Sequence, residues 1–115
     1  MAQRPGRNAR SGKRATLGGL FVRSSWEHNY CLILNELVKR GEIICWHYEP
    51  EVFVFPVKRG TRHYTPDFQV WFPDGTYEWH EVKGYMDDKS RIKLRRFELH
   101  HPMEAARLKL IDKAI

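Results

Sequence analysis

The sequence has few cysteines and no long apolar run, and both features narrow the kind of protein it encodes. Among its 115 residues only Cys31 and Cys45 are cysteines, they do not form a CxxC pair, and each is set among apolar residues. We interpret them as buried thiols in a reducing compartment rather than as a disulfide or zinc ligands. No run approaches the roughly 20 apolar residues that span a bilayer, and the N-terminus lacks the apolar segment of a secretory signal. The sequence therefore predicts a cytoplasmic protein with no membrane partner.

Acidic residues are absent from the first 23 positions, although the chain carries 14 of them. From Ser24 onward basic and acidic residues are equal in number, so the net charge of +6 lies entirely in residues 1–23. With several glycines and little apolar surface, this segment is predicted to be a basic flexible arm that binds a polyanion, most simply nucleic acid. A solubilising tail or an organelle transit peptide are the alternatives. The basic residues of the arm are Arg4, Arg7, Arg10, Lys13, Arg14 and Arg23.

Residues 24–115 are predicted to form one domain, because a chain of this length can bury one modest core and not two. Apolar residues recur at helical spacing over residues 24–40, with Ser24 as the N-cap and Gly41 as the stop signal. Glu27, in the first turn, fits a capping box in which its carboxylate bonds the N-cap amide. The domain therefore begins with a helix.

Two runs of strand-forming residues follow, at 43–49 and 51–57, separated by Pro50. They predict either two strands or one long bent strand. The basic segment 58–63 contains Gly60 and leads into the next strand as a turn. Arg62 and His63 would lie at its end, where contacts to phosphate are one interpretation and a solvated turn is the other.

The segment 64–84 organises the chain. A turn signal, Pro73-Asp74-Gly75, lies between two runs of β-branched and aromatic residues and predicts a hairpin with a three-residue loop. Counting back from the loop along both strands places Asp67 directly opposite Glu81. Because side chains alternate between the faces of a strand, these two carboxylates share a face.

Lys83 shares that face, while Val82 points to the core and His80 lies on the opposite face with a structural role. The Cβ atoms of opposed residues are roughly 4.5–5.5 Å apart, so Asp67 and Glu81 can ligate one hard cation such as Mg²⁺. The cation would cancel the carboxylate repulsion and lower the pKa of a bound water. Lys83 would orient that water or offset charge on a phosphate. An exposed hairpin with ordinary salt bridges is the alternative.

Beyond residue 84 a helix is predicted at 89–100, with Ser90 as a further possible cap, and Pro102 ends it. Residues 106–111 then alternate weakly and predict a last strand, parallel to its neighbour across a helical crossover. Lys89 and Arg91 lie close behind the acidic strand and are interpreted as DNA contacts, with a solvated helix face as the alternative. The predicted order is helix, three strands, helix, strand.

These residues carry a resemblance. Pro66-Asp67, thirteen intervening residues and Glu81-Val82-Lys83 resemble the PD-(D/E)xK nuclease signature. The surrounding motifs are Phe21-Val22-Arg23-Ser24-Ser25-Trp26-Glu27, Tyr64-Thr65-Pro66-Asp67-Phe68 and Glu81-Val82-Lys83-Gly84. In this order and at these separations they resemble the phage endonuclease I family of Holliday junction resolvases, over residues 22–111.

The resemblance implies an α/β fold with a restriction-endonuclease-like αβββαβ core, a mixed β-sheet flanked by helices. It implies a Mg²⁺-dependent, structure-selective DNA endonuclease that hydrolyses phosphodiester bonds at four-way junctions, with Mn²⁺ as a substitute ion. Asp67, Glu81 and the Val82 carbonyl would hold the metal, Lys83 would orient the nucleophilic water, and Glu27 would support the metal or a second ion. A restriction-like or repair nuclease, or a non-catalytic DNA-binding module, are the alternatives.

The resemblance also implies a homodimer, because a twofold dimer would place two sites symmetrically on a four-way junction. The matching bridge between subunits is residues 55–63, in which Pro56 and Gly60 suit a crossing linker as well as an ordinary turn. If the chain is phage-encoded, the predicted location is the cytoplasm of the host cell.

Overall fold

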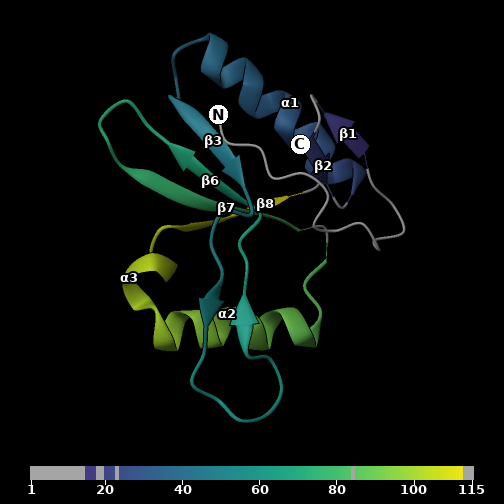
Figure 1. Cartoon of the computed structure of the whole chain (residues 1–115), viewed down its shortest axis with the longest axis vertical. Helices are drawn as coiled ribbons and strands as arrows, with labels where there is room; N and C mark the ends of the chain where they lie inside the picture. Colours follow the sequence, from purple (N-terminus) through teal and green to yellow (C-terminus); the bar gives the residue numbers. More distant parts are fainter. Residues whose placement is uncertain (1–14, 18–19, 23, 84, 113–115) are drawn as a thin grey trace.

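A mixed four-stranded sheet forms the centre of the protein, whose computed structural model describes residues 15–17, 20–22, 24–83 and 85–112. Its strands lie in the order β3-β6-β7-β8 (Figure 1). They are β3 (Cys45–Tyr48), β6 (Phe68–Trp71), β7 (Tyr77–Lys83) and β8 (Leu108–Asp112). The first three are antiparallel and β8 runs parallel to β7. The protein is therefore of the mixed α/β class, and the parallel last strand is confirmed.

Helix α1 (Ser25–Lys39) covers one face of this sheet. Ser24 caps it, its side chain accepting a hydrogen bond from the Glu27 amide at 3.2 Å. Just beyond the helix Gly41 adopts φ +76°, a conformation that favours glycine, so the predicted start and stop are both confirmed. The core under α1 contains Tyr30, Cys31, Leu34, Ile43, Trp46, Tyr48, Phe68, Val70 and Val82.

Helix α2 (Asp88–His100) lies on the other side of the strands (Figure 1). Its N-cap is Asp87, whose side chain accepts a hydrogen bond from the Ser90 amide at 2.8 Å. The prediction that Ser90 caps the helix was therefore wrong. The chain turns at His101 and Pro102 opens a second short helix, α3 (Pro102–Ala105), which the sequence did not predict. The core on this side contains Phe53, Phe55, Tyr64, Trp79 and Phe97.

The hairpin of β6 and β7 has the predicted register. Phe68 pairs with His80 and Trp71 with Tyr77, which continues to Asp67 opposite Glu81. The loop closes through a bond from the Phe72 amide to the Thr76 carbonyl at 2.8 Å. Val82 is buried in the core under α1, also as predicted.

The segments on either side of Pro50 belong to different sheets. Residues 43–49 contribute β3, whereas only β4 (Phe53–Val54) forms in residues 51–57, and it pairs with β5 (His63–Tyr64). Glu49, with φ +46°, separates the two runs, so there are two strands rather than one bent strand. The loop between β4 and β5 projects beyond α2 (Figure 1), and residues 55–63 thus join two strands of one chain.

Two short strands lie within the segment that was expected to be a flexible arm. β1 (Ala15–Leu17) and β2 (Leu20–Val22) pair as an antiparallel hairpin that contacts α1. The predicted DNA contacts of the arm all lie outside the described residues: Arg4, Arg7, Arg10, Lys13, Arg14 and Arg23.

Cys31 and Cys45 are free, as predicted, but only Cys31 is buried and Cys45 is half-buried. In the described part of the chain, no helix is long and apolar enough to cross a membrane.

Candidate active site

Three carboxylates from three separate places in the chain line one cavity of about 340 Å³. Glu27 lies in the first turn of α1, Asp67 directly precedes β6, and Glu81 lies in β7. All three are buried, with exposed fractions of 1 to 7%. The register of the β6–β7 hairpin brings Asp67 and Glu81 together, and the packing of α1 against the sheet brings Glu27 to them. The two carboxylates that the hairpin was predicted to bring together therefore line one cavity.

Each carboxylate accepts a hydrogen bond from a buried donor. The hydroxyl of Tyr48, at the end of β3, donates to Glu27 Oε1 at 2.9 Å. The Val82 amide donates to Asp67 Oδ2 at 2.9 Å. The Tyr64 hydroxyl donates to Glu81 Oε1 at 2.6 Å. The three donors belong to three different strands, β3, β5 and β7, and each hydrogen bond fixes the orientation of one acidic side chain.

Two lysines complete the charged lining of this acidic cavity. Lys83 Nζ lies 3.8 Å from Glu81 Oε2, which confirms that the two side chains share a face of β7. Lys93, from α2, also lines the cavity. Ser24, Trp26, Tyr64, Thr65, Val82 and Tyr85 form the rest of the lining.

Burial makes this concentration of negative charge costly. Moving a carboxylate out of water requires compensation by hydrogen bonds, cations or a metal ion. The field of the site reaches Cys31, one turn after Glu27 on α1. Burial, followed by the charges of Glu27 and Asp67, raises the pKa of the Cys31 thiol to about 12. A divalent cation beside the carboxylates would relieve this unfavourable field.

The donor chemistry fits Mg²⁺, which binds proteins through one or two carboxylates and keeps several waters for the remaining positions. Asp67, Glu81 and the Val82 carbonyl are hard oxygen donors of that kind. Among the described residues, no group of three or more His, Cys, Asp or Glu side chains is arranged to hold a metal ion. Glu27 therefore does not join Asp67 and Glu81 as a ready-made set of three carboxylate ligands.

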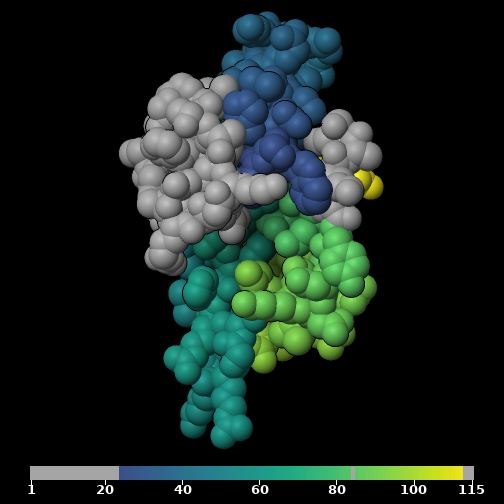
Figure 2. Space-filling model, turned by 90° about the vertical axis from the view of Figure 1, so that its right-hand side faces the viewer, coloured from purple at the N-terminus to yellow at the C-terminus, as the bar shows by residue number. Residues whose placement is uncertain are grey.

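A second, basic cavity of about 720 Å³ adjoins the first, and Lys93 lines both. It lies between the β5 end of the projecting loop and α2. Figure 2 shows these two segments, teal and green, side by side on one face, with the start of α1 above them. Arg96 holds the wall together, since its Nη1 donates to the carbonyls of Arg59 and Thr61. The basic cavity is lined by Gly60, Thr61, Arg62, His63, Lys89, Ile92, Lys93 and Arg96.

Of the four predicted DNA contacts that the structure describes, three line the basic cavity and one does not. Arg62, His63 and Lys89 line it, whereas Arg91 lies on another surface and forms an ion pair with Asp88 at 3.1 Å. Lys93 and Arg96 also line the cavity and were not singled out among the predicted contacts. Their spacing was the available signal, because positions 89, 93 and 96 fall on one helix face and 91 does not.

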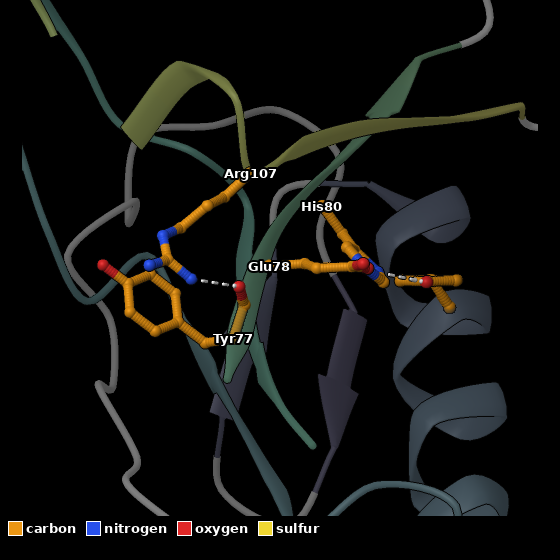
Figure 3. Close-up of polar contacts among 5 residues, drawn as sticks. Tyr77, Glu78, His80 and Arg107 are labelled. Atoms are coloured by element: carbon orange, nitrogen blue, oxygen red, sulfur yellow. Dashed lines mark hydrogen bonds and ion pairs between the residues drawn. The ribbon is translucent and has the colours of Figure 1, made fainter. Parts of the chain in front are cut away.

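His80 stands apart from the acidic cavity, as its strand parity predicted. Its Nδ1 lies 2.6 Å from the Tyr30 hydroxyl and its Nε2 lies 2.9 Å from Glu78 Oε1. Figure 3 shows His80 and Glu78 side by side, on the side of β7 away from Tyr77 and Arg107. Burial lowers the pKa of His80, with Glu78 opposing the shift, so the ring is neutral at pH 7. A neutral ring between these partners donates from Nε2 to Glu78 and accepts from Tyr30.

Comparison with protein-family models, with curated proteins and with solved structures finds no match to this chain. The geometry of the two cavities is therefore what points to a function.

Proposed function

We propose that the protein is a Mg²⁺-dependent DNA endonuclease of the PD-(D/E)xK type. The observation that carries the proposal is the convergence of the buried carboxylates of Asp67 and Glu81 with Lys83 on one cavity. A salt-bridged hairpin on the surface, the alternative explanation of the same spacing, does not bury two opposed carboxylates. The order α1, β3, β6, β7, α2, β8 agrees with the restriction-endonuclease-like core that the sequence motifs suggest.

Five residues of the acidic cavity have proposed roles in phosphodiester hydrolysis. Asp67, Glu81 and the Val82 carbonyl would hold Mg²⁺, which when bound would offset phosphate charge and lower the pKa of a water ligand. Lys83 orients the attacking water and neutralises charge that develops on the phosphate. Glu27, held by Tyr48, orients water next to the metal-binding carboxylates rather than binding the ion directly.

The basic cavity supports a nucleic acid substrate. Its lysines and arginines begin where the acidic cavity ends, at Lys93, so a strand cut in one cavity would have its neighbouring phosphates in the other. We propose four-way DNA junctions as the substrate and a homodimer as the active form, because paired symmetric cuts need two sites related by a twofold axis. A nuclease acting on another DNA structure is the second candidate, since this fold serves many substrates.

A cleavage assay tests the proposal. A four-way junction, a duplex and a single strand of matched sequence are incubated with the protein, with Mg²⁺ or with EDTA. We expect Mg²⁺-dependent cutting of the junction, abolished in Asp67→Asn and Glu81→Gln. Lys83→Ala should reduce the cleavage rate by about 10²- to 10³-fold and leave DNA affinity nearly unchanged.

Three outcomes would contradict the assignment. Wild-type cleavage rates in Asp67→Asn with Mg²⁺ would exclude Asp67 as a ligand. Equal losses of binding and cleavage in Lys83→Ala would remove its proposed role in the transition state. Binding of DNA with no cleavage under any metal condition would favour the non-catalytic DNA-binding module.

A further inference from the structure

Two aromatic side chains at the edge of the acidic cavity are exposed. Trp26 and Tyr85 both line the cavity, and their exposed fractions are 41% and 77%. Two other tryptophans, Trp46 and Trp79, are buried in the two cores. Exposing a large aromatic ring gives up the stabilisation that its burial would provide. What distinguishes them from the other exposed apolar side chains that the structure describes is that both line the acidic cavity, where a ligand could contact their rings.

Both aromatic residues are close in sequence to residues proposed for catalysis. Trp26 directly precedes Glu27 in the first turn of α1. Tyr85 follows Lys83 by two residues, in the segment that leads from β7 to α2. The cavity thus combines a charged interior, which suits a phosphate and its metal ion, with an aromatic edge, which suits a flat apolar group. A nucleotide has both parts in one unit.

We propose that Trp26 and Tyr85 stack on an unstacked nucleobase next to the phosphate that is cut, and so select DNA in which base stacking is interrupted. This inference depends on the proposed nuclease function. Aromatic side chains bind bases by stacking on the π-face, regardless of base identity. Inside a continuous duplex both faces of each base are covered by neighbouring bases, so the rings have no face to contact. At a branch point stacking is broken and a face becomes accessible.

The positions of two lysines are compatible with this mode of binding. Lys83 and Lys93 line the cavity beside the aromatic edge, and Lys93 continues into the basic cavity. The backbone of the bound strand would pass from the cut phosphate along Lys93 into the basic cavity, while one base turns towards the rings. Selectivity for interrupted stacking then comes from the protein surface at the cutting site.

Tryptophan fluorescence in EDTA tests the contact without requiring cleavage. Trp26 is exposed, whereas Trp71 is half-buried and Trp46 and Trp79 are buried, so stacking on a base should quench mainly the emission of Trp26. The probes are a four-way junction, a duplex of matched sequence and the same junction with abasic sites at the branch. We expect stronger quenching by the intact junction than by the other two, and loss of most of that difference in Trp26→Leu.

Binding and cleavage of variants provide the second readout. Tyr85→Leu should lower affinity for the junction by about tenfold or more and affinity for the duplex much less. Tyr85→Phe keeps the ring and is the matched control, which should behave as wild type. Because Tyr85 is largely exposed, both variants should fold, which circular dichroism verifies.

The possible results separate this inference from the nuclease proposal. Unchanged junction-to-duplex ratios in both Tyr85→Leu and Trp26→Leu, or equal quenching by the abasic junction, would overturn the stacking role while Mg²⁺-dependent cleavage stands. Strong selective quenching without cleavage would overturn the nuclease and keep the stacking. Trp26 emission that changes with protein concentration in the absence of DNA would assign the ring to contact with a second copy and contradict the proposal.

Discussion

At the scale of single residues, the tyrosine hydroxyls decide how well the acidic site is organised. Tyr64 is buried and donates to Glu81 at 2.6 Å. Tyr64→Phe removes this donor from a buried carboxylate, which should lower the free energy of unfolding by about 1–3 kcal/mol. Removing the hydrogen-bond partner of a metal-binding side chain typically lowers metal affinity or activity by about 10- to 100-fold. Urea unfolding without metal and Mg²⁺ titration of cleavage measure the two effects.

Tyr77→Phe is the matched control for this change. Its hydroxyl donates to both oxygens of Glu104 at 2.8 Å, away from the acidic cavity. The control should lose stability and keep the wild-type Mg²⁺ dependence. If both variants shift the Mg²⁺ requirement equally, Tyr64 has no specific role in the site.

The buried His80 should make the free energy of unfolding depend on pH in the acidic range. Burial lowers its pKa below the usual 6.5, so the folded state favours the neutral ring. The stability from this preference is present above pH 6.5 and is lost as the pH falls below 6.5, because the unfolded chain gains the proton first. Urea unfolding at pH 7.5 and pH 5.5 should show a decrease in wild type that is smaller in His80→Gln. Equal decreases would exclude His80 as a source of the pH dependence.

The sequence was sufficient to predict the positions of residues that depend only on the alternation of side chains along a strand. Asp67, Glu81, Lys83 and Val82 are placed by counting from one turn, so their relative positions are local properties of the hairpin. The hydroxyl partner of Glu81 could not be found in this way. Its distance depends on how the β4–β5 pair packs against the central sheet, which no local pattern encodes.

At the scale of elements, the loop between β4 and β5 is fixed to α2 through Arg96. Gly60, in this loop, has φ +73°, and an added Cβ would lie 3.3 Å from Arg96 Nη1. Gly60→Ala should therefore cost about 1–2 kcal/mol of backbone strain and displace the arginine that shapes the basic cavity. We expect a lower free energy of unfolding together with weaker DNA binding, measured in EDTA at several salt concentrations.

Gly41→Ala separates the two causes. Gly41 has a similar φ of +76°, but an added Cβ would have no atom within 4 Å. This control should show the strain without the loss of DNA affinity. Equal DNA affinity in both variants would indicate that the loop position does not matter for binding.

Prediction of elements was accurate for long periodic segments and incomplete for short ones, since the run 51–57 was predicted as a strand but only Phe53–Val54 form one. The fifteen residues of α1 carry an N-cap, an apolar face and a stop signal that agree with one another. β4 and β5 contain two residues each and form because Phe53 and Tyr64 bury their rings against Phe97 of α2. That stabilisation comes from distant residues, so the local sequence could not predict it.

At the scale of the whole molecule, the described residues of a single chain are enough to line the acidic cavity. Glu27, Asp67, Glu81 and Lys83 line it together, and residues 55–63 turn back on their own chain. The Phe55 amide donates to the Arg62 carbonyl at 2.7 Å, which closes the loop internally. The bridge between subunits that the sequence motifs suggest stays a prediction, because the structure holds a single chain. A homodimer could join two complete sites or two shared ones.

Mixing two inactive variants distinguishes complete from shared sites. Glu27→Ala and Lys83→Ala chains are unfolded together and refolded, so that mixed dimers can form. If each site comes from one chain, every centre carries one defect and the mixture should remain inactive. If the sites are shared, half of the centres in mixed dimers are wild type, and single-strand nicking of a junction should return. Wild type refolded with Lys83→Ala is the positive control for nicking, and recovery in the test mixture would show that a second chain completes the site.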